Sequence, residues 1–120
     1  MARVQTRSGL WAWAPVVAWM AMIFAFSSIP SLGSGLSFDY VLRKCAHATE
    51  YAVLAVLLIR ALGRELPAFA LGVAYAASDE LHQHFVRGRH ASPVDVAIDA
   101  AGLAIGLLVW RRARHLGRSR

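Results

Sequence analysis

The chain has 120 residues, of which 58% are hydrophobic and only 17% are charged. Its length allows one domain, and a soluble domain of this size needs about a quarter charged residues to cover its large surface. The composition therefore argues against a soluble globular domain, and more firmly against a disordered one. The single cysteine, Cys45, excludes an internal disulfide framework and a cysteine-rich zinc site. The formal net charge of +6 could indicate a nucleic-acid-binding protein. The positions of the charges along the chain decide whether it does.

The first apolar segment runs from Leu10 to Phe26 without a charged residue. A bilayer core about 30 Å thick needs about 20 helical residues, so this segment with the two following serines just suffices. We predict a transmembrane helix over residues 10–28. A cleaved signal peptide is the alternative, because basic residues precede the segment and Ala25-Phe26-Ser27 loosely suits a cleavage site. The tryptophans favour a retained helix with interfacial anchors: Trp11, Trp13 and Trp19.

Three further helices follow a loop that is rich in glycine, proline and serine. The apolar runs and turn signals predict helices at about 41–62, 66–85 and 93–110, with a basic tail over residues 111–120. Gly63-Arg64-Glu65 is typical of a tight turn between two of them. The prediction is an all-α fold, a bundle of about four transmembrane helices that forms a single domain over residues 1–120.

The distribution of Lys and Arg predicts the orientation of this bundle. One side collects Arg3, Arg7, Arg60, Arg64, Arg111, Arg112, Arg114, Arg118 and Arg120, and the other holds Arg43, Lys44, Arg87 and Arg89. Because cytoplasmic loops carry the excess of positive charge, we expect a multi-pass protein of the cytoplasmic membrane with both termini cytoplasmic. Headgroup contacts explain the basic tail. We therefore expect membrane lipids as partners and no nucleic acid.

Helical periodicity places the unusual polar residues on one face of each of the last three helices, all at the extracytoplasmic ends. The three stripes consist of Lys44, His47, Glu50 and Tyr51; then Tyr75, Asp79, His82 and Gln83, with Glu80 at the margin; and then Asp95, Asp99, Gly102 and Gly106. The glycines should let another helix approach closely and bring Asp99 against it. Intramembrane ionisable groups are costly and usually mark a site. We expect a shared functional pocket, with interhelical hydrogen bonding as the structural alternative.

These stripes resemble three motifs of the VanZ-like membrane proteins. The first is Lys44-x-x-His47-x-x-Glu50-Tyr51 with Leu54, the second is Ser78-Asp79-Glu80-x-His82-Gln83-x-Phe85-x-x-Gly88-Arg89, and the third is Ser92-x-x-Asp95-Val96. The resemblance covers about residues 43–106. Arg87 stands where proline is expected and Asp99 where asparagine is common. The resemblance implies a small multi-helix protein of the cell envelope. The family name derives from a protein associated with resistance to the glycopeptide antibiotic teicoplanin, and no settled activity comes with it.

The residues themselves suggest an anionic ligand, because cations are retained on the side that normally lacks them. Arg89 can bind phosphate in a bidentate way, and Lys44 can assist it. The catalytic candidates, which could perform acid–base chemistry, are His47, Glu50, Asp79, His82 and Asp95. The substrate-binding candidates are Lys44, Tyr51, Glu80, Gln83, Arg89 and Asp99. A divalent metal fits this chemistry, but no His-Glu-x-x-His spacing specifies one, so the cofactor stays unknown.

Three functional hypotheses follow from this set. The first is an enzyme that acts on a lipid-linked cell-wall precursor or a phospholipid headgroup. The second is a binding or transport module for such a headgroup. The third is an accessory protein of envelope assembly, with self-association as a further open question. Ser78, Ser92 and Cys45 lack a recognisable nucleophile setting, so the sequence does not decide between enzyme and non-enzyme.

Overall fold

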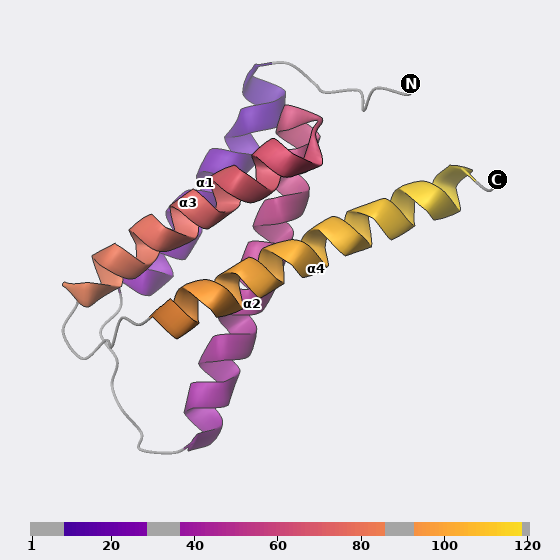
Figure 1. The fold of residues 1–120 in the computed structure, drawn as a ribbon. Coiled ribbons are helices and arrows are strands. Elements are labelled where there is room, and N and C mark those ends of the chain that lie inside the picture. Colours follow the sequence, from indigo (N-terminus) through magenta and orange to yellow (C-terminus); the bar gives the residue numbers. More distant parts are fainter. Residues whose placement is uncertain (1–8, 29–36, 86–92, 119–120) are drawn as a thin grey trace.

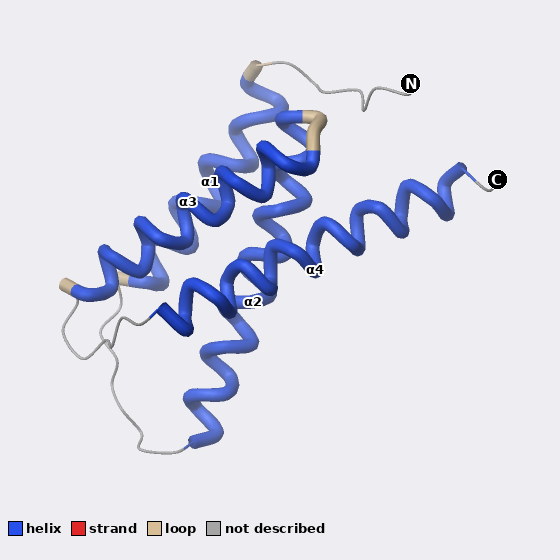
Figure 2. Tube along the Cα trace, in the orientation of Figure 1, coloured by secondary structure: helices blue, strands red, loops and turns tan. Residues whose placement is uncertain are grey.

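The computed structural model describes residues 9–28, 37–85 and 93–118, and four helices account for nearly all of them. They are α1 (Leu10–Ser27), α2 (Ser37–Leu62), α3 (Glu65–His84) and α4 (Pro93–Arg118), as Figure 1 shows. No strand occurs within these ranges, and only short turns separate helix from helix where the connection is described (Figure 2). The predicted all-α class and the number of helices are confirmed.

The helix ends follow local sequence. α3 begins after a turn in which Gly63 has a φ of 74°, a left-handed conformation that glycine adopts without strain. α2 begins at Ser37, earlier than predicted, and α4 continues to Arg118. The residues expected as a basic tail are therefore helical as far as Arg118. Arginine, alanine and leucine are strong helix formers, and neither glycine nor proline occurs between Arg111 and Leu116 to end the helix.

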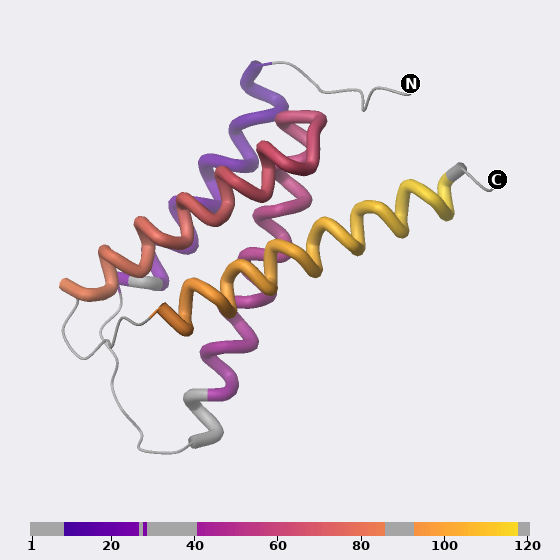
Figure 3. Tube along the Cα trace, in the orientation of Figure 1, coloured from indigo at the N-terminus to yellow at the C-terminus, as the bar shows by residue number. Residues whose placement is uncertain are grey.

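The four helices alternate in direction along the bundle, as the colour sequence in Figure 3 shows. α2 packs most extensively on α4, and α3 contacts both of them. α1 lies against α2 and α3, and within the described residues it does not reach α4. The start of α2, the end of α3 and the start of α4 therefore gather at one end of the bundle. The α2–α3 turn and the end of α4 belong to the other end.

The core combines large aliphatic side chains with small residues that let backbones approach. Leu54, Leu58, Ile59 and Leu103 are fully or almost fully buried. A Cβ built on Gly102 would come within 2.9 Å of the Ala48 Cα, so the α4 backbone lies directly on α2. Gly106 lies on Ala52, and Gly72 on the Leu103 side chain, in the same way. Small residues at helix contacts are typical of helices that pack within membranes.

Two helical segments are long and apolar enough to cross a membrane, Val41–Leu62 and Pro93–Gly117. Only 33% and 28% of their most apolar windows are buried inside the protein, so most of that apolar surface faces outward. The apolar part of α1, Leu10–Phe26, is shorter. An exposed apolar surface of this kind suits a lipid environment. These features support a membrane protein, while four complete crossings stay a prediction.

Candidate functional site

The polar stripes of α2, α3 and α4 meet in the structure, because the three helix ends that carry them lie at the same end of the bundle. We use the name polar cluster for six residues whose side chains connect these helices: Lys44, His47, Tyr51, Asp79, Asp95 and Asp99. Four of them are buried, with Tyr51 0%, Asp99 1%, Asp79 2% and Asp95 8% exposed.

Two ion pairs join α2 to α4 within the cluster. Lys44 Nζ pairs with Asp95 Oδ1. One helical turn deeper, His47 Nδ1 lies 3.4 Å from Asp99 Oδ1. The two contacts are three residues apart on α2 and four residues apart on α4, and residues at either spacing lie on the same face of a helix. Lys44, expected to bind an anion, is therefore engaged by a carboxylate of the protein itself.

Tyr51 links α2 to α3. Its hydroxyl donates a hydrogen bond to Asp79 Oδ2 at 3.2 Å. The charge of Asp79 also acts on His47 and on Asp99. The Tyr51–Asp79 pair and the His47–Asp99 pair are therefore close enough to interact electrostatically. Tyr75 lies beside them, with its ring centre 6.2 Å from that of Tyr51 and its hydroxyl donating to the Met20 carbonyl at 2.5 Å.

Buried carboxylate oxygens without hydrogen-bond donors are the most unusual feature of the cluster. Asp79 Oδ1 and both carboxylate oxygens of Asp99 are buried, and no hydrogen-bond donor from the described residues reaches them. His47 lies close to Asp99 but beyond good hydrogen-bond geometry. Buried polar atoms in proteins are nearly always hydrogen-bonded, so each such oxygen requires an explanation.

The neighbouring candidates border the cluster. Glu50 is half-buried, and its charge acts on His47 and on Tyr75. Its backbone carbonyl accepts a hydrogen bond from the Trp19 indole at 2.9 Å, which fastens α1 to α2. On α3, Glu80 and Gln83 are buried, with 7% and 4% of their surfaces exposed.

His82 has its contacts with α1. Its Nε2 shares a hydrogen bond of 2.9 Å with Ser28 Oγ, and its ring stacks on Phe24 with centroids 4.1 Å apart. We expected His82 to share a cavity with Glu50 and Asp99. The structure instead gives it a position in the α1–α3 contact, where stacking on an apolar ring orients the imidazole.

Three sequence candidates for the anion site and the loop lie outside the described residues: Arg87, Arg89 and Ser92. Among the residues described, no group of three His, Cys, Asp or Glu side chains could hold a metal ion. Cys45 is exposed, and the Ser78 hydroxyl donates to the Tyr75 carbonyl at 2.7 Å. Neither side chain has a general base beside it in the described contacts.

One interhelical contact was not predicted from the sequence. Glu65 at the start of α3 accepts a hydrogen bond from Arg111 Nε on α4, at the opposite end of the bundle from the polar cluster. Both residues flank apolar helices at the ends predicted to lie on one side of the membrane. Opposite charges at equivalent depths of antiparallel helices are the signal that could have found the pair.

The fold and the cluster define a small helical protein of membrane type, with acidic and basic side chains enclosed at one end of the bundle. The VanZ/LLP1 family model matches residues 10–114. The chain therefore belongs to the VanZ/LLP1 family, as its three motifs predicted. It has no significant match to a curated protein or to a solved structure.

Proposed function

We propose that this VanZ/LLP1 protein spans the cytoplasmic membrane several times and that its polar cluster binds and acts on a lipid headgroup. The headgroup belongs to a phospholipid or to a lipid-linked precursor of the cell wall. The observation that carries the proposal is the set of buried carboxylate oxygens of Asp79 and Asp99 that lack donors. Inside a low-dielectric bundle such atoms are costly, and a bound hydroxyl or ammonium group would supply the missing donors.

The roles divide between the two pairs. His47 is the proton-transfer group, because imidazole exchanges protons near neutral pH and Asp99 lies 3.4 Å from its Nδ1. Tyr51 fixes Asp79 through its hydroxyl. A headgroup donor would then lie between the two aspartates, while Arg89, from the neighbouring loop of the sequence, would hold the phosphate.

Lys44 takes a different role from the one that the sequence suggested. Its ion pair with Asp95 compensates its charge, so the pair as a unit contributes little net attraction for an anion. For Lys44 to bind phosphate, Asp95 would have to exchange its partner. We therefore assign the anion primarily to Arg89 and treat Lys44 and Asp95 as a link between α2 and α4.

The test is lipid mass spectrometry combined with metal analysis of the full chain purified in detergent. We expect one lipid species to co-purify with the wild-type protein, and Asp79→Asn and Asp99→Asn to reduce its amount about tenfold, the effect of losing one charge-assisted hydrogen bond. Ser78→Ala is the matched control, because Ser78 is an exposed neighbour of Asp79 on the same helix. Equal lipid content in all four proteins contradicts the proposal. Turnover of the bound lipid then distinguishes an enzyme from a carrier.

A second candidate function is an accessory role in which the polar residues only hold the helices together. The observation that favours it is that both ion pairs, Lys44–Asp95 and His47–Asp99, join α2 to α4. In that case Asp99→Asn lowers the melting temperature and changes no bound lipid. A relation to teicoplanin resistance rests on the family name alone, and susceptibility of cells with and without the protein tests it.

A further inference from the structure

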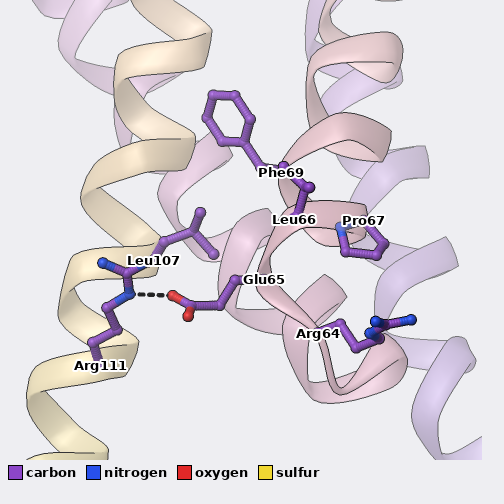
Figure 4. Close-up of a pocket in the computed structure, with 7 residues that line it drawn as sticks. All are labelled: Arg64, Glu65, Leu66, Pro67, Phe69, Leu107 and Arg111. Atoms are coloured by element: carbon purple, nitrogen blue, oxygen red, sulfur yellow. Dashed lines mark hydrogen bonds and ion pairs between the residues drawn. The ribbon is translucent and has the colours of Figure 1, made fainter.

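A second site lies at the end of the bundle opposite the polar cluster. There an open groove of about 700 Å³ runs between the start of α3 and the C-terminal half of α4 (Figure 4). Its charged lining consists of Arg64, Glu65 and Arg111, and its apolar lining includes Leu66, Phe69 and Leu107. We use the name basic groove for this feature. It is separate from the site of the proposed function and does not depend on it.

The arginines of the basic groove keep most of their donors available. Arg111 uses its Nε for the hydrogen bond to Glu65, which leaves the two terminal nitrogens of the guanidinium. No described residue pairs with the Arg64 side chain. The same end also carries Arg60 and Arg112, against the single carboxylate of Glu65 among the described residues there. The groove therefore has a net positive charge.

The apolar side of the groove is unusual for a solvent-facing surface. Leu66, which lines the groove, is 78% exposed. Phe69 and Leu107 lie deeper, on the two helices that form the walls. In Figure 4 the Arg64 side chain extends away from Arg111, so the apolar lining has an arginine on each side. Such a lining matches a molecule with a hydrocarbon chain and an anionic head.

We propose that the basic groove binds an anionic phospholipid, with its phosphate attracted by the positive charge of Arg64 and Arg111 and an acyl chain along Leu66, Phe69 and Leu107. The charge argues against a second copy of the chain, because a rotation axis along the membrane normal brings equal basic ends together. The apolar walls argue against free phosphate. Membrane phospholipids are also present at the depth where an apolar helix such as α3 begins.

The experiment measures binding of phosphatidylglycerol to the full chain by native mass spectrometry, with phosphatidylcholine as the neutral comparison. We expect Arg64→Ala to weaken phosphatidylglycerol binding about tenfold, since one charge-assisted hydrogen bond is lost. Arg112→Ala is the matched control: it removes the same charge at the same end from an exposed residue that does not line the groove. It should leave the bound phospholipid almost unchanged.

Glu65→Gln distinguishes an effect of charge on lipid binding from an effect on folding. It breaks the same ion pair as Arg111→Ala but makes the groove more positive instead of less. We expect Glu65→Gln to tighten phosphatidylglycerol binding and Arg111→Ala to weaken it. Equal losses in the Arg64 and Arg112 variants would show a general attraction of basic residues and overturn the site. Equal binding of phosphatidylcholine, or displacement of phosphatidylglycerol by inorganic phosphate, would overturn the anionic phospholipid as its ligand.

Discussion

Gly102 of α4 lies against Ala48 of α2 so closely that a Cβ at Gly102 would be 2.9 Å from the Ala48 Cα. Asp99 precedes Gly102 by almost one helical turn, and His47 is adjacent to Ala48. The approach of the two backbones therefore brings the His47 and Asp99 side chains to 3.4 Å. The glycine positions of α4 set the geometry of the polar cluster, and not only the packing of the helices.

Replacement of Gly102 by alanine should separate α2 from α4. The added methyl group meets backbone atoms, which cannot rotate away, so we expect a loss of about 1–3 kcal/mol of stability. Thermal unfolding in detergent measures this loss. Gly117→Ala is the control, because nothing lies within 4 Å of the position that its Cβ would take. An unchanged melting temperature for Gly102→Ala would show that α2 and α4 are not in close contact.

Removal of the Tyr51 hydroxyl should destabilise the bundle by about 1–3 kcal/mol. The change Tyr51→Phe takes away the donor to Asp79 Oδ2, while Asp79 Oδ1 already lacks a described donor. The comparison is Tyr75→Phe, which removes the donor to the Met20 backbone carbonyl. That carbonyl lies within helix α1, so its loss of one donor should cost less. Thermal unfolding of Tyr51→Phe, of Asp79→Asn and of the double variant gives the coupling energy between the two residues. A coupling near zero would contradict a direct tyrosine–aspartate bond.

The sequence predicted the helices and the meeting of the polar stripes because both follow from periodicity and from antiparallel connections. The stripe of Asp95, Asp99, Gly102 and Gly106 carried enough information to expect a close contact with another helix. That contact is observed with α2. Helix lengths were less predictable. The end of α4 depends on the helix propensity of arginine and alanine, and a hydrophobic pattern carries no information on that propensity.

Partners across helices were less predictable than faces. Lys44 and His47 share a stripe, but periodicity does not say which aspartate each one contacts, since that depends on the rotation and translation of α4. His82 shares a stripe with Asp79 and yet contacts α1, because its position lies towards the α1 side of α3. The basic groove arises from helix ends that are distant in sequence.

The orientation of the bundle is testable by labelling. In a Cys45-free background, single cysteines replace Ser34 and Ser119, and a membrane-impermeant thiol reagent is added to intact cells. Because the excess of Lys and Arg predicts cytoplasmic termini, we expect Ser34→Cys to be labelled and Ser119→Cys to be protected until the cells are lysed. Labelling of Ser119→Cys alone in intact cells would invert the topology and place the polar cluster on the cytoplasmic side.

Substitutions at His47 can separate proton transfer from the contact between α2 and α4. We expect His47→Ala and Arg89→Lys to abolish lipid turnover, the first by removing the proton-transfer group and the second by removing the planar fork that binds phosphate while keeping its charge. His47→Gln is the sharper variant, because its amide keeps a polar side chain beside Asp99 but cannot transfer a proton. It should keep the melting temperature and lose the activity.

His84→Ala serves as the control for His47, since His84 is an exposed histidine of α3 and its only described contact is an edge contact with Phe85. It should retain full activity. If His47→Gln and Arg89→Lys both match the wild-type protein in lipid turnover, then His47 and Asp99 act only as a structural link. The donors that Asp79 and Asp99 lack would in that case have to come from buried water, which satisfies such groups in many proteins.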